Sequence, residues 1–355
     1  MRTGKGTFEA DMERVTAAEF IPWERLREKT ILVTGATGLI GFTLVSALLC
    51  ASRRYGLDLT VLALTRDAAR ARTRFAGQVQ NTSTLRLIEG DVCDIPEIAH
   101  PIDYIVHGAG LTSSKAFVKQ PVETLQTMLE GTMNVLELAR EKQVSGLVYL
   151  SSMEVYGYPQ KGHKVTEEEA GRLLPLVVRN SYPIGKLQCE SLCCAYASEY
   201  GLPVMIARLT QTFGPGISYG DGRVFAEFAR CVKEKRDIIL KTKGETERSY
   251  LYTADAAAAI LTILLKGRPG QAYNTADEST YCSIAGMARA LAQANGIQVC
   301  FDLENEDKNM YLSVLYMDLD TSQLRALGWS PIACGGGGTG AKKLEAMYRS
   351  MMEYM

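Results

Sequence analysis

Tyr182 and Lys186 stand four residues apart in the segment Tyr-Pro-Ile-Gly-Lys. In a helix this spacing places both side chains on one face, and Pro183 suits the first helical turn, where no N–H donor is needed. The ammonium group is expected to lower the pKa of the phenol, so that a phenolate can remove a hydroxyl proton while hydride leaves the carbon. Because a surface Tyr–Lys pair is common, this prediction of alcohol oxidation depends on its context.

Ser152 and Glu154 follow an apolar run, Gly146 to Leu150, that predicts a buried strand. Ligands of parallel sheets bind where strands end, so both side chains are candidates for a site. Ser152 is expected to hydrogen-bond the substrate oxygen alongside Tyr182. Glu154 is expected to orient a water molecule or to assist a second proton transfer. The alternative for Glu154 is a solvated loop acid.

Residues 31–41, Ile-Leu-Val-Thr-Gly-Ala-Thr-Gly-Leu-Ile-Gly, join a predicted strand to a predicted helix. In such a turn one glycine permits the tight bend, one lets the backbone approach phosphates, and one lets helix and strand pack closely. The helix N-terminus then offers N–H groups to an anion. The segment therefore predicts a dinucleotide pyrophosphate site, with cofactor contacts at Gly35, Thr37, Gly38, Leu39 and Ile40.

The end of the second predicted strand bears on the choice between NAD and NADP. An acidic residue there would bind the ribose hydroxyls of NAD. The chain has Thr65-Arg66-Asp67 instead, so that Arg66 could pair with a 2′-phosphate or stack on adenine, while Asp67 could still reach the ribose. Asp91, followed by Val92, is a candidate for the adenine amino group. We expect NAD, with NADP as the alternative because of Arg66.

Short apolar strands alternate with helical segments through the first 210 residues, which predicts an α/β fold of the Rossmann type with a doubly wound parallel sheet. Beyond Arg208 the pattern loosens, and the glycine-rich run 214–222 is expected to be irregular. We therefore expect an N-terminal extension (1–29), a dinucleotide-binding domain carrying the catalytic residues (30–210), and a smaller, interleaved C-terminal lobe that mainly binds substrate (211–355). A flexible turn at 335–338 and a final helix at 341–354 complete the prediction. The expected strands are 30–35, 59–64, 85–88, 104–107, 146–150 and 204–208, and the expected helices of this part are 41–50, 121–142 and 183–200.

The composition argues against several other classes of protein. The chain carries 39 Lys+Arg against 40 Asp+Glu without a basic block, which gives nucleic-acid or membrane-surface binding little support. Nine cysteines without a Cys-x-x-Cys pair, and only three histidines, predict no metal site. Residues 1–30 lack a signal-peptide core, and the longest apolar run, 256–265, is too short to span a bilayer. A cytoplasmic location is the resulting expectation.

Together these motifs resemble the extended short-chain dehydrogenase/reductases, the NAD-dependent epimerase/dehydratase group that acts on nucleotide sugars. The resemblance covers about residues 28–330 and also rests on His-Gly-Ala-Gly (107–110), Arg-Leu-Thr-Gln-Thr-Phe-Gly-Pro-Gly (208–216), Asp-Gly-Arg-Val (221–224) and Glu-Arg-Ser-Tyr-Leu-Tyr-Thr-Ala-Asp (247–255). It implies cofactor contacts at Gly108 and Ala109 and places Lys186 on the nicotinamide ribose. It also implies substrate contacts at Gln211, Arg223 and Arg248. Gln211 stands where the family often has Asn, and Met128 stands where an Asn often supports the site.

Within the group, Glu154 after Ser152 and the later Arg223 and Arg248 resemble UDP-glucuronate decarboxylases. The 4,6-dehydratases usually carry an Asp–Glu pair after the Ser or Thr, whereas Met153 occupies the Asp position and cannot transfer a proton. The resemblance implies transient oxidation at the sugar C4, loss of carbon dioxide, and return of hydride from a cofactor that stays bound. A 4-epimerase and an NADPH-consuming reductase are alternatives, and a non-catalytic dinucleotide sensor is disfavoured by the Tyr–Lys pair.

The helices expected at 121–142 and 183–200 carry apolar residues on more than one face. The resemblance implies that they pair with those of a second copy, giving a homodimer with a four-helix interface. The alternative is that both helices pack only within the monomer.

Overall fold

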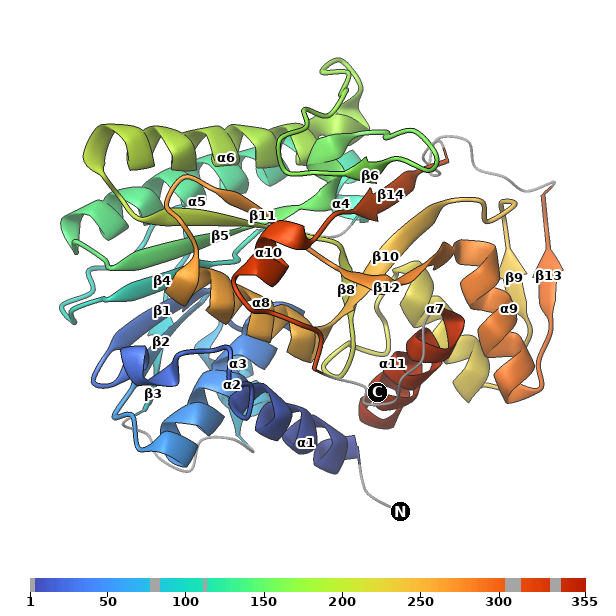
Figure 1. The fold of residues 1–355 in the computed structure, drawn as a ribbon, viewed down its shortest axis with the longest axis horizontal. Helices are drawn as coiled ribbons and strands as arrows, with labels where there is room; N and C mark the ends of the chain where they lie inside the picture. Colours follow the sequence, from blue (N-terminus) through green and yellow to red (C-terminus); the bar gives the residue numbers. More distant parts are fainter. Residues whose placement is uncertain (1–3, 77–83, 111–113, 304–313, 333–339) are drawn as a thin grey trace.

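A computed structural model describes residues 4–76, 84–110, 114–303, 314–332 and 340–355. Its largest element is a seven-stranded sheet in the order β11-β7-β5-β4-β1-β2-β3 (Figure 1), in which every neighbouring pair is parallel. The strand order reverses direction at β1, so the sheet is doubly wound, and the predicted fold class is confirmed. The strands are β1 (Thr30–Thr34), β2 (Thr60–Thr65), β3 (Leu85–Glu89), β4 (Tyr104–His107), β5 (Gly146–Ser152), β7 (Val204–Leu209) and β11 (Ala272–Thr275).

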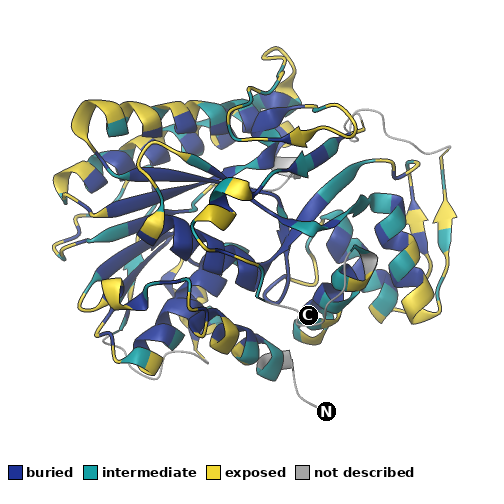
Figure 2. Cartoon of the chain, in the orientation of Figure 1, coloured by how far each residue is buried: buried dark blue, intermediate teal, exposed yellow. Residues whose placement is uncertain are grey.

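Both faces of this sheet are covered by helices, as alternation of side chains along a strand requires. In β1, Ile31 and Val33 join the apolar cluster that includes α2 (Leu39–Tyr55) and α8 (Thr253–Lys266). Leu32 points to the other face, into the cluster that includes α5 (Pro121–Glu141) and α6 (Ser181–Tyr200). Figure 2 shows the buried strands between helices whose outer faces are exposed. The two short helices α3 (Ala68–Phe75) and α4 (Ser114–Lys119) follow β2 and precede α5.

A smaller α/β lobe lies beside the main sheet, on the right of Figure 1. Its sheet has the order β12-β10-β14-β6, with β8 also pairing β10, and β9 and β13 form a separate pair. The strands are β6 (Lys164–Val165), β8 (Gln211–Phe213), β9 (Ile238–Leu240), β10 (Glu247–Tyr252), β12 (Asp277–Ser283), β13 (Val299–Phe301) and β14 (Tyr316–Leu319). The helices of this lobe are α7 (Val224–Lys233), α9 (Ile284–Asn295) and α11 (Ala341–Tyr354), whereas α10 (Ser322–Ala326) contacts β11 at the edge of the main sheet.

The two lobes exchange strands. The last strand of the main sheet, β11, comes from beyond residue 211 and pairs with β7. Conversely β6, which comes from the first 210 residues, pairs with β14 of the second lobe, with Lys164 opposite Asp318. The two lobes are therefore fixed to each other by main-chain hydrogen bonds as well as by side chains.

The first helix, α1 (Gly4–Thr16), packs on α2, α8 and α11, and the sequence pattern gave no indication of it. Phe8 stacks on Phe42 of α2 with ring centroids 5.2 Å apart. Asp11 is buried and accepts a hydrogen bond of 2.6 Å from the Tyr252 hydroxyl of β10. Burial raises the pKa of Asp11 to about 6, against the effects of Tyr252 and Arg14. This helix thus links the main sheet to the second lobe.

The remaining elements follow the sequence predictions closely. The expected helix at 183–200 begins two residues earlier, at Ser181, and the one at 41–50 is longer at both ends. The glycine-rich run 214–222 forms no helix or strand, and the final helix agrees with its predicted bounds. The turn expected at 335–338 lies outside the described residues. Among the described helices, none is long and apolar enough to cross a membrane.

Candidate active site

The turn between β1 and α2 is shaped by its glycines. Gly35 has φ +67°, and a Cβ there would lie 2.7 Å from the carbonyl carbon and oxygen of Gly108. A Cβ on Gly41 would lie 2.2 Å from the carbonyl oxygen of Gly35. Gly38 is the N-cap of α2 and offers no capping side chain, which leaves the first amides of the helix to a ligand. This cradle fits the pyrophosphate of a dinucleotide.

A cleft of about 450 Å³ extends from this turn along the carboxyl ends of the strands. Apart from Asp67, the alternative contact for the ribose, its lining includes every cofactor, substrate and catalytic residue that the sequence predicted, so segments far apart in the chain converge on one cavity. The cofactor candidates come mainly from the main sheet, whereas Gln211, Arg223 and Arg248 come from the second lobe, so these two parts of the lining are called the cofactor end and the substrate end. The roles of the individual residues stay predictions. The predicted residues in the lining are Gly35, Thr37, Gly38, Leu39, Ile40, Arg66, Asp91, Val92, Gly108, Ala109, Ser152, Glu154, Tyr182, Lys186, Gln211, Arg223 and Arg248.

At the end of β2, the Arg66 side chain is 72 % exposed and its Nε lies 3.8 Å from Asp91 Oδ2. Asp67 accepts a hydrogen bond of 2.8 Å from the backbone N–H of Arg70 and so caps α3. Asp91 also accepts a backbone hydrogen bond, from the N–H of Cys93 at 2.9 Å, but it lines the cleft and Asp67 does not. Asp91 is therefore better placed than Asp67 to contact a bound dinucleotide.

The loop after β4 is positioned by buried side chains. Thr34 Oγ accepts hydrogen bonds from the backbone N–H groups of Gly108 (3.2 Å) and Ala109 (3.1 Å). The same hydroxyl lies 2.8 Å from Nδ1 of His107, whose Nε2 lies 3.2 Å from Thr132 Oγ of α5. Burial, helped by the charge of Lys186, lowers the pKa of His107 to about 3, so the imidazole is neutral. These bonds fix the backbone that faces the phosphate turn.

Lys186 and Tyr182 share the first turns of α6 and are both buried. Lys186 Nζ donates a hydrogen bond of 2.7 Å to the carbonyl oxygen of Leu150. Burial lowers the pKa of Lys186 to about 8, although Cys189 and Glu190 act in the opposite direction.

The phenol departs from the sequence prediction. Burial raises the pKa of Tyr182 above its usual value, and the charge of Glu154 adds to this effect. A hydrogen bond with Ser152 and the charges of Arg179 and Arg223 oppose the increase. The expected net lowering of the phenol pKa is therefore wrong, because removing the phenol from water outweighs the nearby positive charges.

A buried ion pair holds α6 against the sheet. Arg208 Nη2 of β7 lies 2.6 Å from Oε2 of Glu190, which follows Lys186 by one helical turn. The Ser151 hydroxyl also donates to Glu190, and Arg208 Nη1 donates to the Tyr156 hydroxyl at 2.8 Å. With its carboxylate satisfied in this way, Glu190 fixes the helix that carries the catalytic pair.

Two residues near the pair were missed by sequence reasoning. The ring of Phe117 in α4 stacks on that of Tyr182 with centroids 4.1 Å apart and planes 11° apart. Arg179, in the short helix η3 (Val178–Asn180), places Nη2 3.2 Å from Oε2 of Glu154 in the short helix η2 (Met153–Tyr156). The only sequence signal for Arg179 is its place three residues before Tyr182. The alternative of a solvated Glu154 does not hold, because its side chain is 25 % exposed and paired.

The substrate end of the cleft contains polar atoms that have no partner among the described residues. They are Oε1 of Gln211 and Nε of Arg248, and both are buried. Arg223 is instead held by Asp221, with Nη2 2.7 Å from Oδ2. Because unpartnered buried polar groups are costly in a folded protein, a ligand that supplies acceptors and donors here would relieve that cost.

Comparison with known proteins gives this arrangement its family. The profile of the NAD dependent epimerase/dehydratase family matches residues 31–276. The chain belongs to this family. Both the suspected resemblance and the prediction of an NAD-dependent enzyme are thereby confirmed. The glycine cradle and the cleft that continues from it fit NAD on structural grounds as well.

The curated relatives have several activities. UDP-glucuronic acid decarboxylase 1 of Xenopus tropicalis is 28% identical over 333 residues, covering 91% of this chain and 74% of the relative. The dTDP-D-glucose 4,6-dehydratase of Bos taurus is 25% identical over 318 residues, covering 85% and 84%. Among solved structures, UDP-glucose 4-epimerase from Thermotoga maritima, with UDP-glucose, has a TM-score of 0.73 at 22% identity and covers 92% of this chain and 98% of its own. The two curated relatives support modification of nucleotide sugars, and the solved structure supports the fold.

Proposed function

We propose that this enzyme oxidises a nucleotide sugar transiently at C4 and, of the reactions open to the family, acts as a UDP-glucuronate decarboxylase. The proposal depends on the two residues that follow Ser152. Met153 is buried and Glu154 lines the cleft, so this segment supplies one carboxylate and not the Asp–Glu pair that the 4,6-dehydratases usually carry. Arg248, whose unpartnered Nε is a donor on a cationic group, supports recognition of an anionic sugar nucleotide, and the unpartnered Oε1 of Gln211 would accept a hydrogen bond from a hydroxyl of the substrate.

In the proposed mechanism, Ser152 and Tyr182 hold the sugar 4-hydroxyl between them. The Tyr182 phenol, whose pKa is raised by burial, first loses its own proton to water, and the nearby Lys186 ammonium stabilises the phenolate that results. This phenolate then takes the hydroxyl proton as the C4 hydrogen leaves as hydride. NAD, when bound, supplies the acceptor of that hydride and returns it at the end of the cycle.

The resulting 4-keto group lies β to the C6 carboxylate. The C5–C6 bond breaks, its electron pair moves into the keto group, and carbon dioxide leaves. Glu154 orients the water or proton needed to protonate C5, and Tyr182 then returns its proton to the oxygen at C4 as hydride comes back. Buried side chains on either side of the phenol exclude bulk water during these steps.

The test is mass spectrometry of purified protein incubated with UDP-glucuronate and a trace of NAD⁺. We expect loss of carbon dioxide without added reductant, and at least about a 100-fold slower loss in Glu154→Gln. An unchanged substrate mass would contradict decarboxylation of this substrate. Decarboxylation at the normal rate by Glu154→Gln would contradict the role given to that carboxylate.

A 4-epimerase is the second candidate, because epimerisation needs only Ser152, Tyr182 and Lys186, and all three line the cleft. A product of unchanged mass but different sugar configuration, found across UDP-, CDP- and dTDP-sugars, would establish it. Need for equimolar NADPH would instead indicate a reductase.

We also propose a homodimer through the outer faces of α5 and α6. Val122 and Met133 of α5 are 70% and 47% exposed, although both are apolar. A second copy packed on this face would cover them in a four-helix interface. Light scattering should give twice the chain mass, and Met133→Glu should lower it. A monomer at micromolar concentration would contradict the dimer.

A further inference from the structure

We infer that Arg179 is a positioning residue that acts through Glu154: it holds this carboxylate in place for the steps that follow C4 oxidation. The inference deepens the proposed function and rests on it. Arg179 does not line the cleft, whereas Glu154 does. Any effect of Arg179 on the substrate must therefore be transmitted by the Glu154 carboxylate that it contacts.

The guanidinium of Arg179 contacts both carboxylate oxygens of Glu154. Its Nη2 lies 3.2 Å from Oε2 and 3.5 Å from Oε1. The two side chains are 16% and 25% exposed, so water screens the pair less than it would at the surface. Since η2 and η3 are short helices from different parts of the chain, the pair also fixes one segment against the other.

The ring of Phe117 also contacts the guanidinium of Arg179. The Arg179 Cζ lies 5.0 Å from the centroid of the Phe117 ring, within the range of a cation–π contact. That same ring stacks on Tyr182. The flat, forked side chain of arginine can meet an aromatic face and a carboxylate at once, which a lysine ammonium does less well. Arg179 therefore connects the position of Glu154 to the aromatic cover of the phenol.

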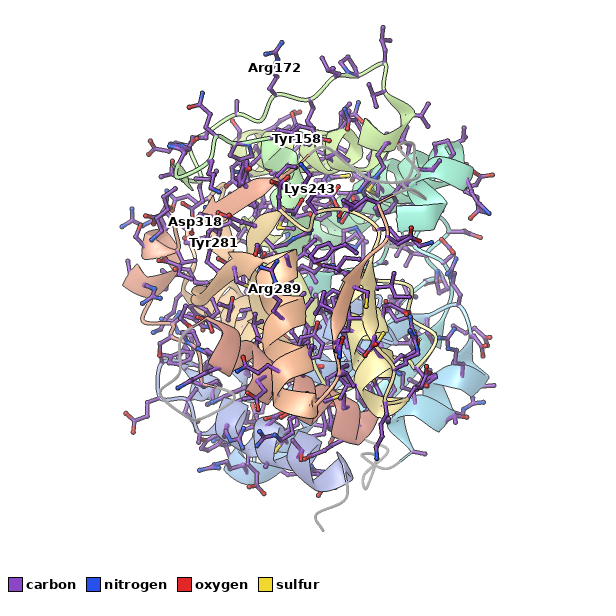
Figure 3. All side chains as sticks on the ribbon, turned by 90° about the vertical axis from the view of Figure 1, so that its right-hand side faces the viewer. Tyr158, Arg172, Lys243, Tyr281, Arg289 and Asp318 are labelled. Atoms are coloured by element: carbon purple, nitrogen blue, oxygen red, sulfur yellow. The ribbon has the colours of Figure 1, made fainter. Side chains whose placement is uncertain are left out.

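The charges around the phenol agree with this geometry. Glu154 raises the pKa of Tyr182, and Arg179 lowers it. Tyr158, on the segment between η2 and β6, lies close enough to Glu154 and Arg179 for each of them to affect its pKa. Figure 3 shows Tyr158 below Arg172. Without Arg179, the Glu154 carboxylate would stand uncompensated beside the phenol and would be free to rotate.

The experiment separates C4 oxidation from the later steps. Stopped-flow absorbance follows the appearance of reduced nicotinamide, and mass spectrometry follows carbon dioxide loss, in the NAD-bound enzyme with UDP-glucuronate. In Arg179→Met we expect oxidation within about 5-fold of the wild type and carbon dioxide loss slower by about 100-fold, so that reduced cofactor accumulates. Arg179→Lys should recover part of the loss, and guanidinium salts should restore activity to Arg179→Ala.

The double variant decides whether Arg179 acts through Glu154. When Glu154→Gln is already present, Arg179→Met should slow carbon dioxide loss by less than about 3-fold more, because the carboxylate through which Arg179 acts has been removed. Multiplication of the two single effects would overturn the inference, and so would an equal loss of oxidation and of carbon dioxide release in Arg179→Met.

A failure of the proposed function would be recognised separately. If the wild type releases no carbon dioxide from UDP-glucuronate, we first identify a nucleotide sugar that reduces the bound cofactor. The rate of product formation from that sugar is then measured in the wild type, the two single variants and the double variant. A second measurement needs no substrate: the changes in unfolding midpoint of Arg179→Met and Glu154→Gln should not add up to the change in the double variant. Additive midpoints would show that the two side chains do not interact, which overturns the inference whatever the reaction.

Discussion

The two ends of the cleft are built in different ways. At the cofactor end, the main chain makes the site: Gly35 and Gly41 occupy positions where a Cβ would collide with backbone atoms. At the substrate end, side chains make the site. Gln211 and Arg248 come from different strands and carry atoms that have no partner among the described residues. The cofactor end is thus fixed before a ligand arrives, while the substrate end is left with unused hydrogen-bonding capacity.

This difference shows where a member of such a family can change its activity. A backbone cradle tolerates almost no substitution, because any side chain would displace it. Side chains at the substrate end can be exchanged one at a time without displacing the backbone of the cradle. Substitutions at the two ends should therefore differ in size and in the ligand they affect.

The largest effect is expected at Gly41. In Gly41→Ala the new Cβ would lie 2.2 Å from the Gly35 carbonyl oxygen, so the turn must open. We expect at least about a 100-fold loss of NAD⁺ affinity by calorimetry. Gly220→Ala is the control, because a Cβ there meets nothing within 4 Å. Affinity within about 3-fold of the wild type in Gly41→Ala would remove the distinction between the two ends.

Lys186 lies where the two ends meet, and its titration should be visible in the rate. With a pKa lowered to about 8, the ammonium is present below that pH and is lost above it. We therefore expect kcat/KM to fall about tenfold per pH unit above about 8. Lys186→Met should be about 100-fold slower at pH 7 and should lack this decrease. The same decrease in the variant would assign it to another group.

Arg248 tests the substrate end alone. In Arg248→Met we expect KM for the nucleotide sugar to rise about 10- to 100-fold, because a guanidinium with a buried, unpartnered Nε is lost, while NAD⁺ affinity stays unchanged. Arg66→Met, at the cofactor end, should leave the sugar KM unchanged. Equal effects of Arg248→Met on both ligands would mean that the two ends are coupled.

The smallest effect on activity is expected outside the cleft, at Asp11. Its pKa is raised from 3.8 to about 6, so the folded protein binds more protons than the unfolded chain between these values. The stability contributed by this group therefore falls as pH rises from about 4 to 6. Relative to the wild type, Asp11→Asn should gain up to roughly 3 kcal/mol in unfolding free energy over that range, at about 1.4 kcal/mol per pKa unit. A pH-independent difference would contradict the shift.

Sequence reasoning succeeded where one local pattern determines the structure. The phosphate turn is a strand, three glycines and a helix in succession, and Tyr182 and Lys186 share one helix face, so both were predictable. Arg179 was not, because its importance comes from a contact with Glu154 across two segments. Helix α1 was missed for a related reason: it is stabilised by burial of Phe8 against α2 and by the Asp11–Tyr252 bond, which are long-range contacts. The phenol pKa was wrong because spacing does not reveal desolvation.

The parallel strand β11 is made from residues 272–275, yet it completes the edge of the sheet next to β7. During synthesis on a ribosome, the first 210 residues emerge with the open side of β7 unpaired, a surface that can pair with other chains. Nascent protein halted at that length should associate with itself or with chaperones, while extension past β11 should release it. The order in which the chain leaves the ribosome thus decides when the last strand of the cofactor-binding sheet can be added.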